Sequence, residues 1–242
     1  MIPQFLTGLA ALAVLPVSAS PHALSRRGTV DSDQLVGLPQ TIPSGATGDL
    51  YSAYQPHLKV VNGCVPFPAV DAEGNTNAGL NPTGSTNGDC SSSTGQIYVR
   101  SGSSGDKYAV MYSWYFPKDE ASTGLGHRHD WEGVIVWLAD SSSTAASNIL
   151  AVCPSAHGGW DCSTSDFTLD GTSPLIKYES VWPLNHSCGL TTTVGGTQPM
   201  VAWESLSTVV QNALDTTDFV KANVPFNENN WASNLEKATF SS

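Results

Sequence analysis

Residues 107–116 read Lys-Tyr-Ala-Val-Met-Tyr-Ser-Trp-Tyr-Phe, and this segment says the most about the fold. Large side chains recur at every second position from Tyr108 to Phe116, and a period of two predicts a β-strand. The short apolar, β-branched run at 133–138 predicts a second, central strand. Weaker strand candidates span residues 96–100, 149–153, 175–178 and 200–203. Many short strands separated by turn residues favour a β-sandwich.

The clearest helical spacing lies in the C-terminal part of the chain. Apolar residues follow an i, i+3, i+4, i+7, i+8 pattern, and they are Leu206, Val209, Val210, Ala213 and Leu214. A second, shorter helix is expected near residues 228–237, resting on Trp231 and Leu235. No repeat or linker divides the sequence, so we expect one mainly β domain.

The composition is that of a globular, acidic protein. Of 242 residues, 40% are apolar and 13% are charged, with 21 acidic against 10 basic side chains. A net charge of −11 repels phosphates at long range. This argues against nucleic acid as a partner and against a polybasic patch that attracts anionic lipid.

The N-terminus predicts export from the cell. An apolar stretch at 5–17 is followed by small residues, so we expect residues 1–19 to be a signal peptide, although its start lacks a basic residue. The alternative is a buried N-terminal helix. Arg26-Arg27 would end a short propeptide at 20–27, leaving residues 28–242 as a secreted, extracellular domain.

Five cysteines agree with an oxidising destination. Cys64 and Cys90 flank a stretch rich in Gly, Asn, Ser and Thr, and Cys153 and Cys162 flank a Gly-Gly turn. Pairing within each couple would leave Cys188 free, but other pairings remain open.

Seven titratable side chains lie within residues 119–132, between the two best strands. Asp130 and Glu132 share strand parity, so an extended backbone points both carboxylates one way. His127 has the opposite parity and joins them only if the backbone turns near Gly126. A hairpin-like return would bring Asp119 close to the same place.

Three carboxylates and one imidazole would form a costly cluster without a cation. Oxygen-dominated ligation favours Mg²⁺ or Ca²⁺, with Mn²⁺ as a third candidate. The alternative is a solvated turn whose acids pair with Arg128 and Lys118.

Four blocks of sequence resemble one family, the necrosis- and ethylene-inducing peptide-like proteins (NLPs). Residues 126–132, Gly-His-Arg-His-Asp-Trp-Glu, match the family's heptapeptide. Residues 109–119 are similar to the block before it, and residues 62–71 and 181–186 are similar to two others. The resemblance covers the chain from about Asp31 onward.

The resemblance implies a secreted cytolysin acting on plant cells. Its fold would be a central β-sandwich with flanking helices, similar to actinoporins and some fungal lectins. A divalent cation would be held by Asp119, His127, Asp130 and Glu132, with Arg128 and His129 in support. Trp182, His186 and His157 would read the sugar head group of glycosylinositol phosphorylceramides in the plant plasma membrane.

The resemblance also implies a disulfide between Cys64 and Cys90 and a segment, residues 109–128, that plant immune receptors sense. Cys153, Cys162 and Cys188 are additions to the usual pattern. Asn185-His186-Ser187 is a glycosylation sequon in the predicted sugar loop, and we expect it to be unoccupied in an active toxin.

Two other functions compete with a cytolysin. One is a non-toxic, sugar-binding or immune-recognised protein. The other is a secreted hydrolase that uses Glu132, His129 and His157 as acid and base, with Arg128 stabilising charge. The acidic charge disfavours a nuclease, and the sequence shows no nucleophile motif such as Gly-x-Ser-x-Gly.

Overall fold

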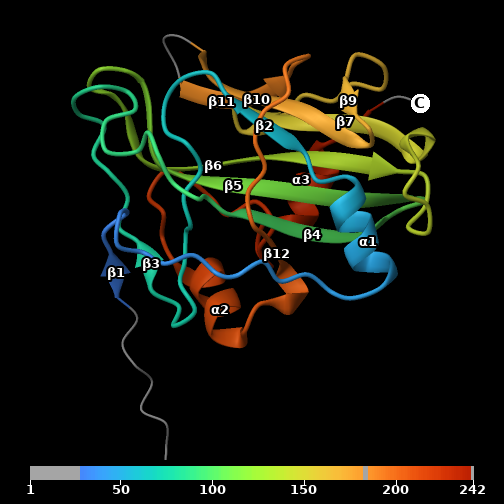
Figure 1. The fold of residues 1–242 in the computed structure, drawn as a ribbon, viewed down its shortest axis with the longest axis horizontal. Coiled ribbons are helices and arrows are strands. Elements are labelled where there is room, and N and C mark those ends of the chain that lie inside the picture. The colour runs from blue at the N-terminus through green and yellow to red at the C-terminus, as the bar shows by residue number, and fades with distance from the viewer. Residues whose placement is uncertain (1–27, 182–184, 241–242) are drawn as a thin grey trace, which may run out of the picture.

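Two β-sheets form the body of the protein, one above the other in Figure 1. The computed structural model describes residues 28–181 and 185–240. The predicted signal peptide, the predicted propeptide and Trp182 lie outside the described residues. The two sheets confirm the predicted sandwich, and the helices lie around it.

The larger sheet has six strands in the order β12-β4-β5-β6-β7-β8. Their bounds are β4 Ile97–Ser104, β5 Lys107–Ser122, β6 Leu125–Leu138, β7 Ile149–Ala156, β8 Gly159–Trp160 and β12 Met200–Ala202. The second sheet runs β11-β10-β2, with β9 paired to β10. Its strands are β2 His57–Val60, β9 Leu169–Asp170, β10 Ser173–Val181 and β11 Asn185–Leu190. A parallel pair, β1 Thr29–Val30 and β3 Thr76–Asn77, stands apart.

The β5–β6 hairpin is the centre of the fold. Every residue from Ala109 to Ala121 is buried, as is every residue from His129 to Leu138. The two strands are longer than the sequence predicts, because the hairpin turns only at Thr123-Gly124 and the acidic segment is paired strand rather than loop. Asp119 therefore lies opposite His127, which confirms the expected return of the chain.

The interior between the sheets is filled mainly by aromatic rings. Phe116 of β5 stacks on Tyr178 of β10, with ring centroids 3.8 Å apart and planes at 5°. On the other face of the large sheet, Trp131 packs against Tyr98 and Phe226. Trp131 thus has the core position that its parity predicts, opposite to Asp130 and Glu132.

Among residues 28–181 and 185–240, three α-helices and two short 3-10 helices flank the sheets. They are α1 Ala46–Ala53, η1 Ala146–Asn148, η2 Trp203–Ser205, α2 Thr208–Thr216 and α3 Trp231–Lys237. The Ser207 hydroxyl caps α2 by accepting from the Val210 N–H, so this predicted helix begins after Leu206. In Figure 1, α3 lies behind the large sheet and α2 below it. No helix among the described residues is long and apolar enough to cross a membrane.

Two disulfides fasten loops to this framework. Cys64 joins Cys90, and Cys153 joins Cys162, which leaves Cys188 as a free, buried thiol. The first bond closes the Gly- and Ser-rich loop, as the resemblance implies.

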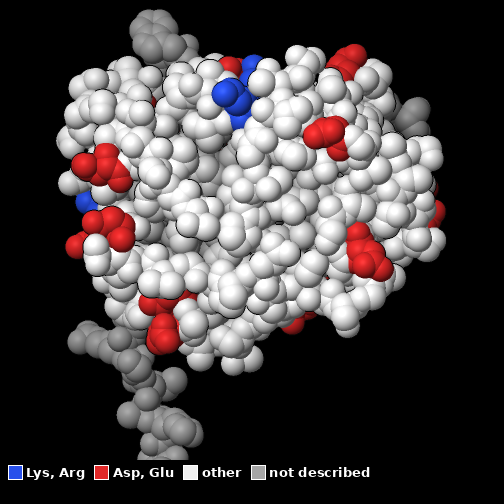
Figure 2. All heavy atoms as spheres, viewed as in Figure 1, with Lys and Arg blue, Asp and Glu red and all other residues white. Residues whose placement is uncertain are grey.

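Figure 2 shows that acidic side chains on one face lie apart from each other, mainly toward its rim.

Candidate metal centre

The four predicted cation ligands all lie on the β5–β6 hairpin. Asp119 is 1% exposed, Asp130 6% and Glu132 7%, whereas His127 is half-buried. The carboxylates face the second sheet, as their hydrogen bonds with β10 and β11 show. The hairpin therefore brings together the two ends of the acidic segment at 119–132.

Two backbone irregularities allow this convergence. Gly126 has φ +149°, and a Cβ there would lie 2.0 Å from the Asp119 carbonyl oxygen, so only glycine fits. His129 has φ +61°, a left-handed conformation that costs free energy in a non-glycine residue. Because His129 interrupts the extended backbone, His127 and Asp130 line the same cavity despite their opposite parity. The sequence predicts the turn at Gly126 but gives no sign of the one at His129.

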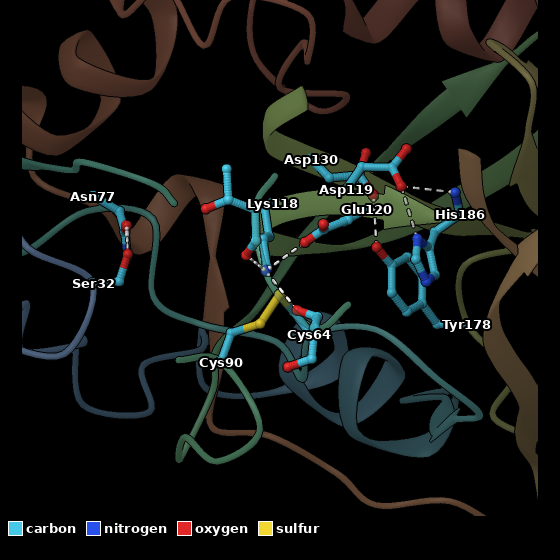
Figure 3. Close-up of a disulfide and its surroundings, with 12 residues drawn as sticks. Ser32, Cys64, Asn77, Cys90, Lys118, Asp119, Glu120, Asp130, Tyr178 and His186 are labelled. Atoms are coloured by element: carbon cyan, nitrogen blue, oxygen red, sulfur yellow. Dashed lines mark hydrogen bonds and ion pairs between the residues drawn. A yellow bond between two sulfur atoms is a disulfide. The ribbon is translucent and has the colours of Figure 1, made fainter. Parts of the chain in front are cut away.

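Side chains behind the carboxylates hold each of them in place, and Figure 3 shows the partners of Asp119 and Asp130. Asp119 Oδ1 accepts from the His186 backbone N–H at 3.0 Å and from its Nδ1–H at 2.7 Å. The Tyr178 hydroxyl donates to Asp130 Oδ2 at 2.9 Å. The Ser155 hydroxyl donates to Glu132 Oε2. These contacts fix the direction of three anionic groups before any ligand arrives.

The His127 ring is also oriented by its surroundings. Its Nδ1–H donates to the carbonyl oxygen of His129 at 2.8 Å. The other nitrogen, Nε2, lies 3.6 Å from Asp119 Oδ2. A ring nitrogen tied to a backbone carbonyl, with the second nitrogen facing a carboxylate, is the arrangement found in metal-binding histidines.

The electrostatics favour an added positive charge. Burial raises the pKa of Asp130 well above its usual value, and the neighbouring Asp119 raises it further. Burial likewise raises the pKa of Glu132, with Asp130 as the next cause. Carboxylates in this state are stabilised by a cation.

The basic side chains of the hairpin are committed elsewhere. Lys118 Nζ lies 2.6 Å from Glu120 Oε2 and donates to the Ser85 carbonyl oxygen. Arg128 donates to the carbonyl oxygens of Ala78 and Gly79. The alternative prediction is a solvated turn whose acids pair with Arg128 and Lys118. It is wrong for the predicted ligands, although Lys118 does pair with Glu120 of the same segment.

The donor set suits a hard cation, although the side chains do not close around one point. Within residues 28–181 and 185–240, no three His, Cys, Asp or Glu side chains are already arranged as a metal site. Cation binding remains a prediction for Asp119, His127, Asp130 and Glu132.

A cavity of about 230 Å³ opens beside the acids and is lined by His127, Asp130 and Glu132. The predicted sugar-contacting residues lie in different settings around it. His157 is exposed, next to Gly158 and Gly159 on the cavity wall, whereas His186 is buried behind Asp119. Trp182 is outside the described residues. The half-buried Asn185 of the sequon lines the cavity.

The predicted supporting residues face away from the acids. His129 accepts from the Tyr115 hydroxyl at 2.6 Å and packs against Phe219. Burial lowers the pKa of His129 to about 4, and the charge of Arg128 adds to this effect. His129 and Arg128 therefore shape the hairpin and the loop at 78–81 rather than the acidic pocket.

Three residues of the centre escape prediction from the sequence. Tyr178 and Ser155 hold predicted ligands, and burial raises the pKa of the Cys188 thiol close to Glu132. Tyr178 and Ser155 lie in or near predicted strands, where a small or aromatic residue carries no signal of its own, and Cys188 lies on β11, which is not predicted from the sequence. Only the pairing of strands brings them to the acids.

Comparison with known proteins identifies the class of protein to which this fold belongs. A sandwich of this kind is described for solved relatives as a toxin fold for microbial attack and plant defense. The sequence profile described as "Necrosis inducing protein (NPP1)" matches residues 48–238. NLP effector protein 2 of Phytophthora capsici is 45% identical over 214 residues, covering 87% of each chain. The chain belongs to the necrosis inducing protein family.

Solved structures extend the comparison to the fold. NLPPya in complex with mannosamine has a TM-score of 0.83 and 45% identity, covering 88% of this chain and 100% of that one. A non-toxic protein, HaNLP3, has a TM-score of 0.82 and 35% identity, covering 87% of this chain and 100% of its own. These neighbours share the sandwich, and one of them binds an amino sugar.

Proposed function

We propose that this chain is a secreted toxin that lyses plant cells. It binds a divalent cation through Asp119, His127, Asp130 and Glu132, and a sugar head group docks beside that cation. The target is the glycosylinositol phosphorylceramide of the plant plasma membrane, and the outcome is permeabilisation and necrosis. It acts outside the producing cell.

One observation carries the proposal: of three buried carboxylates on one hairpin, Asp130 and Glu132 line a cavity and Asp119 lies next to the His127 ring, which lines it too. The basic side chains of the same hairpin pair elsewhere. Such a cluster is stable with a cation and costly without one. Bound there, Mg²⁺ or Ca²⁺ would supply a positive centre that coordinates sugar hydroxyls. The binding of mannosamine by NLPPya supports a sugar as the ligand.

Dye release from plant plasma-membrane vesicles tests the proposal. We expect the purified protein to release dye with Mg²⁺ or Ca²⁺ present, and release to fall to background after chelation. Asp119→Asn should behave like the chelated protein. Asp33→Asn is the matched control, because Asp33 is exposed and far in sequence from the hairpin. Undiminished release after effective chelation would contradict the proposal.

A non-toxic, immune-recognised protein is the second candidate. HaNLP3 supports it, because a closely similar fold belongs to a non-toxic protein. Residues 109–121 of the predicted immune segment are buried in β5, so a receptor would reach them only after the fold opens. Binding to the glycolipid without dye release, together with immune signalling from a peptide of residues 109–128, would select this candidate.

We further propose that the protein is not an enzyme. The acid–base pair considered for a hydrolase needs His129 close to Glu132, but His129 packs against Tyr115 and Phe219. Turnover of RNA or glycans by the purified protein would revive the hydrolase.

A further inference from the structure

The wall of the cavity beside the acids also contains basic side chains. Lys221 and Lys237 line its wall, as do Trp160 and Asn234. Lys221 follows α2 in sequence and Lys237 is the last residue of α3, so two separate segments place ammonium groups there. The acids come from the hairpin, and the lysines come from the loop after α2 and from the end of α3.

These two lysines differ from most other cations of the protein, because they have no acidic partner among the described residues. Five of the eight basic side chains in the described part of the chain are held by ion pairs or carbonyl oxygens, namely Arg100, Lys107, Lys118, Arg128 and Lys177. Of the other three, Lys59 lies on β2 and two line this one cavity. The chain has 21 acidic side chains, so two lysines without an acidic partner in the described part of the chain are not expected at the same cavity by chance.

Asp218, the acid nearest in sequence to Lys221, is engaged in a local hydrogen bond. Asp218 Oδ1 accepts from the Val220 backbone N–H at 2.8 Å, which closes a local turn. Val220 has φ +63°, a rare and costly conformation for a β-branched residue. The turn that sets the direction of Lys221 is thus fixed at an energetic cost, as is common at ligand sites.

Trp160 and Asn234 line the same cavity, are held by hydrogen bonds and suit a sugar ring. The Trp160 indole N–H donates to Asn234 Oδ1 at 3.3 Å, and Asn234 Nδ2 donates to the Pro225 carbonyl oxygen at 2.9 Å. With its N–H engaged, the half-buried indole presents an apolar wall, which suits the C–H face of a sugar. The cavity volume of about 230 Å³ is below the roughly 300–1,000 Å³ of drug-sized pockets, which favours one or two rings.

We propose that Lys221 and Lys237 bind an anionic group, a hexuronate carboxylate or a phosphate, on the same glycan whose neutral hexose docks beside Asp130 and Glu132. This inference rests on the proposed sugar binding and adds the residues that recognise the charge of the ligand. It explains how a protein of net charge −11 selects an acidic head group: the attraction is local, while the rest of the surface repels.

Calorimetric titration with matched ligands tests the inference. One ligand is a hexosyl-glucuronate disaccharide, the second is its uncharged methyl ester, and the third is a hexose phosphate, all measured with Mg²⁺ present. We expect the unaltered protein to bind the free acid or the phosphate about tenfold more tightly than the ester, which is the magnitude of charge-assisted hydrogen bonds. The stronger of the two anions identifies the group that is read.

Variants separate the lysines from charge in general. Lys221→Gln with Lys237→Gln should remove the preference for the anion and leave affinity for the ester unchanged. Lys59→Gln, which removes a lysine outside the cavity, should keep the preference. Equal binding of acid and ester by the unaltered protein, or a preference that survives in the double variant, overturns the inference but leaves the proposed function standing. Binding of none of the three ligands contradicts both.

Discussion

His186 holds Asp119 by two hydrogen bonds to a single oxygen, one from its backbone N–H and one from its ring. The ring is stacked on Tyr178 at 4.9 Å, and it fits because Gly63 has no side chain: a Cβ there would lie 2.4 Å from His186 Nε2. His186 is thus fixed from three sides. Its first role is to orient a predicted cation ligand, and β11 is joined to the hairpin at this point.

We predict that His186→Ala weakens cation binding as well as sugar binding. Loss of a group that orients a ligand lowers metal affinity by about 10- to 100-fold. Isothermal titration of the purified variant with Ca²⁺ or Mn²⁺ measures this directly. The control is His157→Ala, because His157 is exposed on a turn. Unchanged cation affinity in His186→Ala would restrict this residue to reading the sugar.

Much of the fold can be predicted from local periodicity. The alternation at 107–116 and the apolar run at 133–138 lie within β5 and β6, where large apolar side chains are buried. Helix α1 cannot be predicted in this way, since its segment Ala-Thr-Gly-Asp-Leu-Tyr-Ser-Ala contains glycine and few apolar residues in helical spacing. Tertiary packing of Leu50 and Tyr51 stabilises it instead.

The site is less predictable from sequence than the fold. The acidic residues stand out because they are concentrated in one segment, but their supporting partners come from β7, β10 and β11. The left-handed backbone at His129 has no clear sequence signal, because histidine adopts this conformation far less readily than glycine does. Both the supporting partners and the backbone conformation at His129 depend on long-range strand pairing, which cannot be read from the local sequence pattern.

The buried pair of Lys118 and Glu120 should matter for stability. The two side chains are 1% and 0% exposed, and Lys118 also ties the loop at Ser85 to β5. Lys118→Met leaves the Glu120 carboxylate buried without its partner, so we expect a loss of about 3–5 kcal/mol in the free energy of unfolding. Urea titration followed by tryptophan fluorescence measures the loss.

The matched control for this variant is Lys177→Met. Lys177 pairs with Glu179, but both side chains are about one-third exposed, so we expect a change below about 1 kcal/mol. Similar destabilisation in the two variants would contradict the assignment of Lys118–Glu120 as the structurally important pair.

Gly126→Ala should damage the hairpin at the metal centre. The new Cβ would collide with the Asp119 carbonyl oxygen, which forces the ligand-bearing backbone to move. We expect a loss of roughly 2–4 kcal/mol in stability together with loss of cation affinity. Gly124→Ala also has a positive φ but meets no neighbour, so it should cost only about 1 kcal/mol and keep the cation. Equal effects on cation affinity would show that close contact at Gly126 is unimportant.

We predict that the protein has one free thiol and that this thiol is protected from alkylation in the native state. With Cys64–Cys90 and Cys153–Cys162 closed, the free Cys188 is 5% exposed, so the native protein should resist iodoacetamide. Unfolding in guanidinium without reductant should allow one alkylation per chain, located at Cys188 by peptide mass mapping. Labelling of the native protein, or of any other cysteine, would be inconsistent with this pairing and burial.

The cation site itself can be tested most directly by anomalous diffraction from crystals soaked in MnCl₂. We predict one strong peak enclosed by Asp119, His127, Asp130 and Glu132, lost in crystals of Asp119→Asn. A map in which that position stays empty at saturating Mn²⁺ would contradict the account.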